Sequence, residues 1–184
     1  PYTCSDETLR EIKTVSRHWQ VPYLIHLAET RDELRMIEDK YAESPVVYLH
    51  NLGVLDENTI AVHANWLSDL EIDLFARQGV KVAHCPESNM KLAAGMAPVP
   101  ELLRRGITVG LGTDGAASNN NLDLFREMGM TAKVHKVVQS EPTVMDTTTV
   151  LRMATIEGAR LLGLEQQIGT VEVGKSADLI LIDL

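Results

Sequence analysis

The sequence predicts an α/β fold whose parallel sheet forms part of a (β/α)8 TIM barrel. Strand-like apolar runs alternate with helical patterns from one end of the 184 residues to the other, and each of four such runs ends in an ionisable side chain. The alternation is typical of βα units, which build either an open doubly wound sheet or a barrel. The polar strand ends favour the barrel, because a barrel gathers the carboxyl ends of its strands on one face.

The four expected strands are short and rich in β-branched residues. Each is separated from the next by at least one stretch with helical patterning, so parallel pairing is expected. The four strand-like runs cover residues 21–27, 59–64, 80–85 and 107–112. A tail, "GTVEVGKSADLILIDL", places turn residues between two further β-rich runs and is expected to form a pair of strands.

Capping residues set the expected helix boundaries. Ser5 and Ser68 are good N-caps, Pro45 suits the first turn of a short helix, and Gly79 suits a helix end. The charged stretch after the first strand, and a short stretch before Gly106, are also expected to be helical. Two longer helices are expected at about 122–139 and 146–162.

The strand ends offer groups that bind metals. A single histidine at such a place is more often a hydrogen-bonded structural residue than a ligand. Four successive strands with such a group at the same end are harder to explain in that way, and three of the four could serve a tetrahedral zinc site with one open position. The four residues are His26, His63, His84 and Asp114. Three further histidines lie in helical stretches and are expected to be surface or packing residues: His18, His50 and His135.

Glu29 lies three residues beyond His26, where the first strand turns into a helix. A carboxylate beside a metal ligand matches the arrangement of hydrolytic metal sites, in which the metal supplies hydroxide and the carboxylate moves protons. The alternative is that Glu29 only favours the positive end of the next helix. The spacing alone does not decide between these two roles.

The stretch "ITVGLGTDGAASNNN" contains G-x-G-x-x-G, the spacing of a dinucleotide-binding turn. Such a turn should open a helix at once and be followed by a second strand that ends in an acidic residue. Here a polar stretch follows that is expected to start no helix before about Asn121, and the next segment is helical. We therefore reject nucleotide binding and expect the glycines to give the backbone room around Asp114, which would project into a site.

Composition excludes several classes of protein. The formal charge is −9 with no basic stripe, which argues against a nucleic-acid partner. No apolar run approaches the roughly 18 residues of a membrane span, and no signal peptide is visible. Cys4 and Cys85 form no disulfide framework, so a reduced cytoplasmic setting is expected.

Six blocks of this sequence resemble the amidohydrolase superfamily, in particular its branch of aminohydrolases and chlorohydrolases that contains the S-adenosylhomocysteine/5′-methylthioadenosine deaminases. In the family's order they are "PYTCSDE", "HLAET", "TIAVHANWL", "HCPESNMKLAAGMAPV", "GLGTDGAASNNNLDLF" and "GTVEVGKSADLILIDL". The family carries a His-x-His pair on its first barrel strand, and none occurs here. The resemblance thus implies that residues 1–165 are the C-terminal half of a metal-dependent hydrolase barrel, with strands five to eight. Residues 166–184 would be strands that return to a small β-sandwich domain.

The resemblance also implies roles for single residues. His26 and Asp114 would bind the metal, and His63 would orient the metal-bound water or the developing oxyanion. Glu29 would contact the substrate ring and shuttle protons, and Asp114 would contact substrate and take the proton of the water. His84 and Asn89 match a family block without an assignable role.

For the complete protein the implied reaction is the hydrolytic deamination of an aminopurine nucleoside: S-adenosylhomocysteine, 5′-methylthioadenosine or adenosine. The implied cofactor is one divalent metal ion, zinc by preference over iron or manganese, and the complete protein is expected to be a homo-oligomer. The 184-residue segment alone, with two of the ligands, is expected to bind metal weakly and to be inactive. The alternatives are a hydrolase acting on guanine or a triazine, a metal-free scaffold or binding module, and a nucleotide-binding oxidoreductase.

Overall fold

A computed structural model describes residues 1–183, and its four strands form one parallel sheet. The strands follow one another across the sheet in chain order, and helices occupy the connection between each pair. Such connections are what parallel pairing requires. The strands are β1 (Tyr23–Leu27), β2 (Thr59–His63), β3 (Lys81–His84) and β4 (Val109–Leu111). All four predicted strands are therefore present, each one to three residues shorter than expected.

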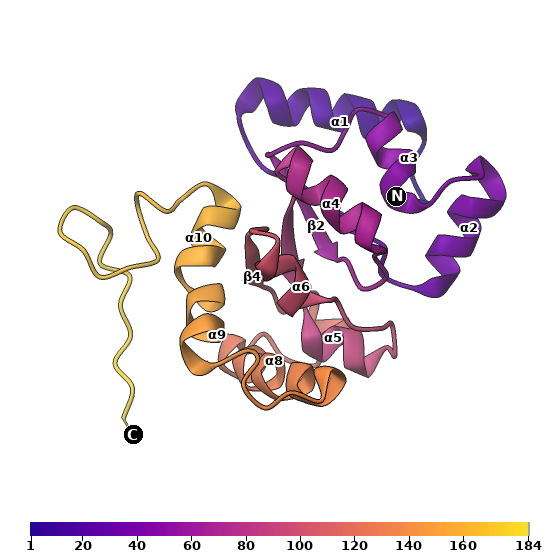
Figure 1. The fold of residues 1–184 in the computed structure, drawn as a ribbon. Helices are drawn as coiled ribbons and strands as arrows, with labels where there is room; N and C mark the ends of the chain where they lie inside the picture. Colours follow the sequence, from indigo (N-terminus) through magenta and orange to yellow (C-terminus); the bar gives the residue numbers. More distant parts are fainter. Residues whose placement is uncertain (184) are drawn as a thin grey trace.

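Ten helices surround the sheet in the described part of the chain. In Figure 1, α1 to α4 gather at one end of the molecule, whereas α5, α8 and α9 lie at the other. Their bounds are α1 (Asp6–Trp19), α2 (Arg31–Tyr41), α3 (Pro45–Asn51), α4 (Asp69–Gln78), α5 (Pro86–Lys91), α6 (Val99–Arg104), α7 (Ala116–Asn119), α8 (Leu124–Gln139), α9 (Thr147–Ala154) and α10 (Ile156–Leu162).

The helix caps predicted from the sequence are confirmed. The Ser5 and Ser68 hydroxyls accept hydrogen bonds from backbone amides in the first turns of α1 and α4. Ser68 also forms a capping box, because the side chain of Glu71 accepts from the backbone N–H of Ser68. Gly79 ends α4 in the left-handed conformation that glycine adopts without strain.

The core lies between the sheet and the helices that pack on it. All five residues of β2 are buried, as expected for a central strand. Phe75 of α4 and Leu102 of α6 are completely buried and belong to the same cluster of apolar side chains as Val82 and Val109 of the sheet. This packing holds the strands in place and so positions the polar residues at their ends.

The helical structure differs from the sequence prediction in three places. The segment after Asp114 was expected to start no helix, yet α7 forms there, and the amide of Asn119 holds its end by donating to the carbonyl of Thr113 (2.7 Å). The expected long helix at 146–162 is two helices, because Thr155 leaves the helical conformation (φ −124°, ψ −97°). Helix α5 was not expected at all.

The expected pair of strands in the tail does not form among the residues that the structure describes. Residues 164–183 contain turns and extended chain without strand pairing, and Figure 1 shows this segment leaving the body of the molecule beyond α10. A strand needs a neighbouring backbone to pair with, and the tail finds only isolated bonds such as that from the amide of Ser176 to the carbonyl of Gln167. Leu184 lies outside the described residues.

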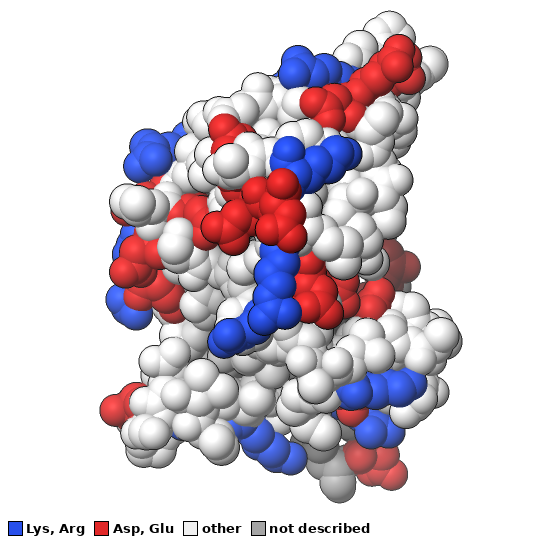
Figure 2. Space-filling model, turned by 90° about the vertical axis from the view of Figure 1, so that its right-hand side faces the viewer, with Lys and Arg blue, Asp and Glu red and all other residues white. Residues whose placement is uncertain are grey.

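The surface is charged but mixed. On the face shown in Figure 2, positive and negative side chains lie next to one another among neutral residues. None of the helices in the described part of the chain is long and apolar enough to cross a membrane.

Candidate metal centre

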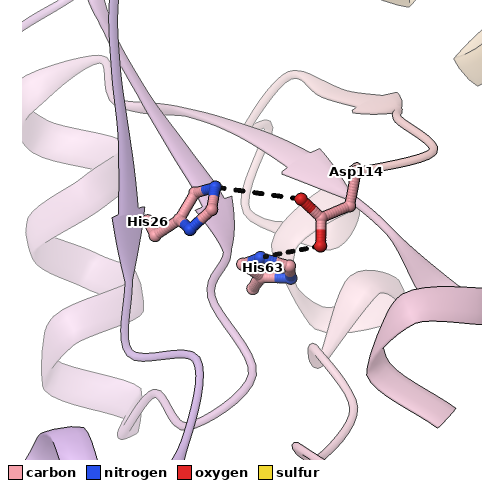
Figure 3. Close-up of side chains that lie close together, drawn as sticks. All are labelled: His26, His63 and Asp114. Carbon is pink, nitrogen blue, oxygen red and sulfur yellow. Dashed lines mark ion pairs between the residues drawn. The ribbon is translucent and has the colours of Figure 1, made fainter. Parts of the chain in front are cut away.

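Three of the predicted strand-end residues converge at one point. His26 comes from β1, His63 ends β2, and Asp114 follows β4; one candidate ligand atom of each lies within 4.8 Å of the others. Nε2 of His26 lies 4.0 Å from Oδ1 of Asp114, and Nε2 of His63 lies 4.0 Å from Oδ2 of the same carboxylate. Figure 3 shows the three side chains turned toward one another. Imidazole nitrogen and carboxylate oxygen are ligands that zinc takes in proteins.

The convergence brings together the two edges of the sheet. β1 and β4 are the two outer strands, and in a flat sheet three strand spacings of about 4.8 Å would keep their backbones roughly 14 Å apart. The side chains of His26 and Asp114 nevertheless come within 4.0 Å of each other, and Asp114 lies in the loop three residues beyond β4. A sheet that curls like part of a barrel wall accounts for this approach.

Unusual backbone conformations direct the chain at these strand ends. His63 (φ 73°), Ala64 (φ 51°), Ala28 (φ 51°) and Asp114 (φ 58°) all adopt positive φ without being glycine. Such residues cost on the order of 1–3 kcal/mol each and cluster where a site needs a fixed geometry. Backbone hydrogen bonds hold them, including one from the amide of Ala64 to the carbonyl of Leu27 (3.0 Å).

His63 is completely buried, and its two ring nitrogens have different surroundings. Nδ1 lies 2.8 Å from Oδ1 of Asn89, within a hydrogen bond. Nε2 has no hydrogen-bond partner among the described residues and faces Oε1 of Glu29 at 3.8 Å as well as Asp114. A buried polar atom without a partner is costly. The donor set and this open nitrogen together fit a metal ion or a polar ligand at this point.

Asp114 is held by two serine hydroxyls. Ser118 Oγ and Ser88 Oγ donate to its Oδ2 at 2.6 Å and 2.7 Å. Burial by itself raises the pKa of Asp114, but the hydrogen bonds from Ser118, Ser88 and the backbone of Gly115, together with the nearby His63, hold the pKa below its usual value. The carboxylate therefore stays ionised and keeps Oδ1 turned toward His26, as a metal ligand requires.

Glu29 does not cap the following helix, although its position in the sequence would allow it to do so. Thr30 caps α2, and the carboxylate of Glu33 accepts hydrogen bonds from the backbone amides of Ala28 and Glu29. The side chain of Glu29 is 22% exposed and lies beside His63. It is thus placed to contact a molecule that occupies the site.

His84 does not join the cluster. It is fully buried, and its Nε2 lies 3.1 Å from Nε2 of His135 on α8. Burial, reinforced by the nearby His135 and His63, lowers the pKa of His84 well below its ordinary value, and burial lowers the pKa of His135 to about 4. This pair is a neutral packing feature, which agrees with the packing role expected for His135.

The glycines of "GLGTDG" have a different use from the one expected. A methyl group on Gly110 would lie 3.1 Å from Cα of Gly158 in α10, and one on Gly112 would lie 3.1 Å from Sγ of Cys85. The first two glycines therefore allow close packing of neighbouring elements. The sharp turn at the site is made by Asp114 itself, at positive φ, and none of Gly110, Gly112 and Gly115 has a positive φ.

Sequence reasoning missed the polar residues around the cluster. Asn65, Ser88 and Ser118 received no role, and Asn89 was left unassigned, yet all four make hydrogen bonds at the site. Their signal was their position, because all four follow a strand-end ligand candidate by two to five residues. Short polar side chains are common in loops, so that position alone did not distinguish them.

Comparison with known proteins places the whole chain within one family. A family model described as "Amidohydrolase family" matches residues 1–184. The chain is 49% identical over 183 residues to the 5-methylthioadenosine/S-adenosylhomocysteine deaminase of Syntrophobacter fumaroxidans and 45% identical over 183 residues to the 5′-deoxyadenosine deaminase of Methanopyrus kandleri. Each alignment covers 100% of this chain but 42% of the relative, so the chain spans about two fifths of the curated relatives it matches.

A solved structure agrees with the sequence relatives. The fold matches that of an adenosine deaminase from Xanthomonas campestris with bound zinc, with a TM-score of 0.94 and 42% identity. The match covers 97% of this chain and 40% of that one.

Proposed function

The chain belongs to the amidohydrolase family, and from this premise we propose that the complete protein is a metal-dependent hydrolase that deaminates an aminopurine nucleoside. The proposed substrates are S-adenosylhomocysteine, 5′-methylthioadenosine and adenosine. Relatives named as deaminases of such nucleosides support the substrate class. Hydrolysis would replace the exocyclic amino group by oxygen and release ammonia.

The single observation that carries the proposal is the convergence of two histidines and two carboxylates at the carboxyl end of the sheet. His26, His63 and Asp114 offer metal ligand atoms within 4.8 Å of one another, and Glu29 lies 3.8 Å from His63. In a barrel, this end of the strands carries the catalytic groups. Ligands and an acid–base group in one place are what a hydrolytic metal site needs.

His26 and Asp114 would hold the metal ion in the complete protein, and zinc is the ion that this mixed set of nitrogen and oxygen ligands favours. The zinc named for the adenosine deaminase from Xanthomonas campestris supports this choice. When bound, such an ion lowers the pKa of water to about 7 and so makes hydroxide available at neutral pH.

The chain's own residues move the protons. Glu29 would donate a proton to the ring nitrogen beside the amino-bearing carbon, which makes that carbon accept hydroxide. Asp114 would take a proton from the attacking water and pass it to the departing amino group, so that ammonia leaves. The hydroxyl proton of the new carbon–oxygen bond returns to Glu29 as the carbonyl forms. Nε2 of His63 faces the same space and would contact the reacting oxygen.

The domain division also remains a proposal. We place the barrel half at residues 1–165 and assign residues 166–184 to a small β-domain, where the tail would find the strand partners it lacks here. The complete protein would be a homo-oligomer, and the 184-residue chain by itself is expected to lack deaminase activity.

A direct assay tests the proposal. The complete protein is loaded with zinc, its metal content is measured, and ammonia release is followed with S-adenosylhomocysteine, 5′-methylthioadenosine, adenosine, guanine and a chlorotriazine. We expect turnover of at least one adenine nucleoside to exceed that of guanine and the triazine. Preference for guanine or the triazine would refute the substrate class, and a protein that retains no metal and turns over nothing would point to a scaffold.

A further inference from the structure

Two buried asparagines connect His63 to the backbone of Glu29. Asn65 lies two residues beyond His63, and Asn89 lies in α5; their side chains are 5% and 1% exposed. Their amide groups face each other and make two hydrogen bonds, from Asn89 Nδ2 to Asn65 Oδ1 (2.8 Å) and from Asn65 Nδ2 to Asn89 Oδ1 (3.1 Å). Two further contacts extend the chain of bonds at either end.

At one end the direction of the hydrogen bond is fixed by chemistry. The backbone carbonyl of Glu29 can only accept, so the atom of Asn65 that lies 3.0 Å from it must be the Nδ2 donor. Asn65 therefore presents its oxygen to the NH2 group of Asn89. That contact in turn leaves the oxygen of Asn89 facing His63 Nδ1 at 2.8 Å.

Turning over the side-chain amides of the two asparagines does not give an acceptable set of hydrogen bonds. If the amide of Asn89 were turned over, its NH2 group would face both the NH2 group of Asn65 and His63. Turning Asn65 over as well would remove that conflict, but it would set an amide oxygen against the carbonyl oxygen of Glu29 in a buried place. Two acceptors in contact, with a donor left unpaired, cost the desolvation of each group.

We propose that Asn89 and Asn65 form an amide relay that keeps the hydrogen of the neutral His63 ring on Nδ1 and its Nε2 lone pair aimed into the site. Asn89 is the positioning residue, because its oxygen accepts the Nδ1 hydrogen directly. Asn65 acts through Asn89 by fixing which way that amide points. The relay thereby leaves the fully buried Nε2, which has no hydrogen-bond partner among the described residues, without a hydrogen and directed into the site.

The relay defines what His63 can do in the proposed reaction, and this consequence rests on the proposed function. An Nε2 lone pair accepts a hydrogen bond from the attacking water, or binds a metal ion. It cannot donate to an oxyanion until it has gained a proton. His63 therefore acts as a hydrogen-bond acceptor that orients the attacking water, whose proton goes to Asp114.

Nitrogen NMR of the metal-free complete protein tests the tautomer without any need for activity. The protein is labelled with 15N-histidine and measured at pH 8, above the ordinary pKa of histidine. The His63 signals are assigned by their loss in His63→Gln. We expect a hydrogen-bearing, pyrrole-type Nδ1 and a pyridine-type Nε2. A hydrogen on Nε2 in the wild-type protein overturns the relay, whether or not the protein is a deaminase.

Variants test whether the relay matters to turnover. Asn89→Leu removes the acceptor, and we expect a mixed tautomer signal with kcat lowered about 10–100-fold at little change in KM, by analogy with the loss of a hydrogen-bond partner from a metal-bound histidine. Asn89→Asp keeps an acceptor and should lose less. Asn51→Leu on the exposed face of α3 is the control for an asparagine-to-leucine change. An unchanged tautomer and kcat in Asn89→Leu contradict the proposal.

The proposed function and the proposed relay can be refuted independently of each other. If no substrate is turned over but His63 carries its hydrogen on Nδ1, the proposed function is wrong and the relay stands. If deamination proceeds while the hydrogen sits on Nε2, the relay is wrong and the function stands. Should Asn89→Leu not fold, Asn65→Asp, which loses the donor to Glu29 and to Asn89, gives the same NMR test.

Discussion

Gly110 of β4 packs so closely against Gly158 of α10 that a side chain at position 110 would force its neighbours to move. A methyl group on Gly110 would lie 3.1 Å from Cα of Gly158 and 3.2 Å from a methyl carbon of Leu161. Because Asp114 follows β4 by three residues, this contact between helix and sheet also holds the loop that carries the carboxylate.

Gly110→Ala is therefore expected to destabilise the complete protein by about 1–3 kcal/mol, the usual cost of overpacking a core. Urea unfolding at pH 7 measures the change. Gly129→Ala in α8, where no atom lies within 4 Å of the new methyl group, is the matched control and should stabilise by up to about 1 kcal/mol. Equal stabilities of the two variants would show that β4 and α10 separate easily.

Glu29→Gln should abolish turnover and leave the zinc content nearly intact. The amide keeps the size of the side chain but cannot donate and regain a proton at the substrate ring, and Glu29 is not a proposed metal ligand. Zinc per protein is measured together with kcat. Glu38→Gln on the exposed surface of α2 is the control and should behave as the wild type. A wild-type rate in Glu29→Gln would remove this residue from the mechanism.

The buried Lys13 makes the fold depend on Asp56. Lys13 is 1% exposed, and its ammonium group contacts Asp56 in a short ion pair and donates to Thr59 Oγ1 at 2.9 Å. Asp56→Ala leaves this charge without its carboxylate and should cost about 3–5 kcal/mol in the free energy of unfolding. Lys13→Met removes the charge together with its desolvation and should cost less.

The order of these two variants is the test. Urea unfolding of both, with the exposed Asp39→Ala as a control, separates a buried charge pair from simple packing. If Lys13→Met is the more damaging of the two, the lysine contributes mainly through its aliphatic stem and the ion pair is unimportant.

The buried pair of His84 and His135 should make the protein sensitive to acid. Burial lowers the pKa of His135 to about 4 in the folded protein, whereas the unfolded chain has a value of about 6.5. The unfolded state thus binds the proton more tightly. This stability is fully present above about pH 6.5 and is lost as the pH falls toward 4, at up to about 1.4 kcal/mol per pH unit for each such group.

His135→Gln should flatten this loss, because glutamine does not titrate and can still hydrogen-bond to His84. Thermal unfolding of the complete protein between pH 8 and 4 measures it. His18→Gln, at an exposed position of α1, is the control and should keep the wild-type profile. A profile for His135→Gln as steep as that of the wild type would assign the acid sensitivity to other groups.

More of the candidate site than of the residues around it could be predicted from the sequence. His26, His63 and Asp114 could be grouped in advance because parallel strands share one carboxyl end, and their convergence is confirmed. Glu29 could be placed near them but not separated from a helix cap, since that distinction depends on Glu33, whose carboxylate accepts the backbone amides there.

Features that depend on a tertiary partner could not be predicted. Asn65 and Asn89 form a relay only when α5 lies beside the end of β2. The sequence of neither segment indicates that the two are in contact. The close packing of Gly110 depends on Gly158 in the same way. In the tail, the alternating pattern predicts strands for which the described residues supply no neighbouring backbone, so that prediction stays untested.

If His26 and Asp114 hold a metal ion as proposed, the 4.0 Å between them also links metal supply to the folding equilibrium. The two side chains come from opposite edges of the sheet, so they can meet only after all four strands have paired, and an unfolded chain offers no such site. An ion that binds only the folded state stabilises it by about 2.7 kcal/mol when present at 100 times its dissociation constant. For the complete protein with the proposed zinc site, zinc starvation should therefore lower the amount of folded protein in a cell.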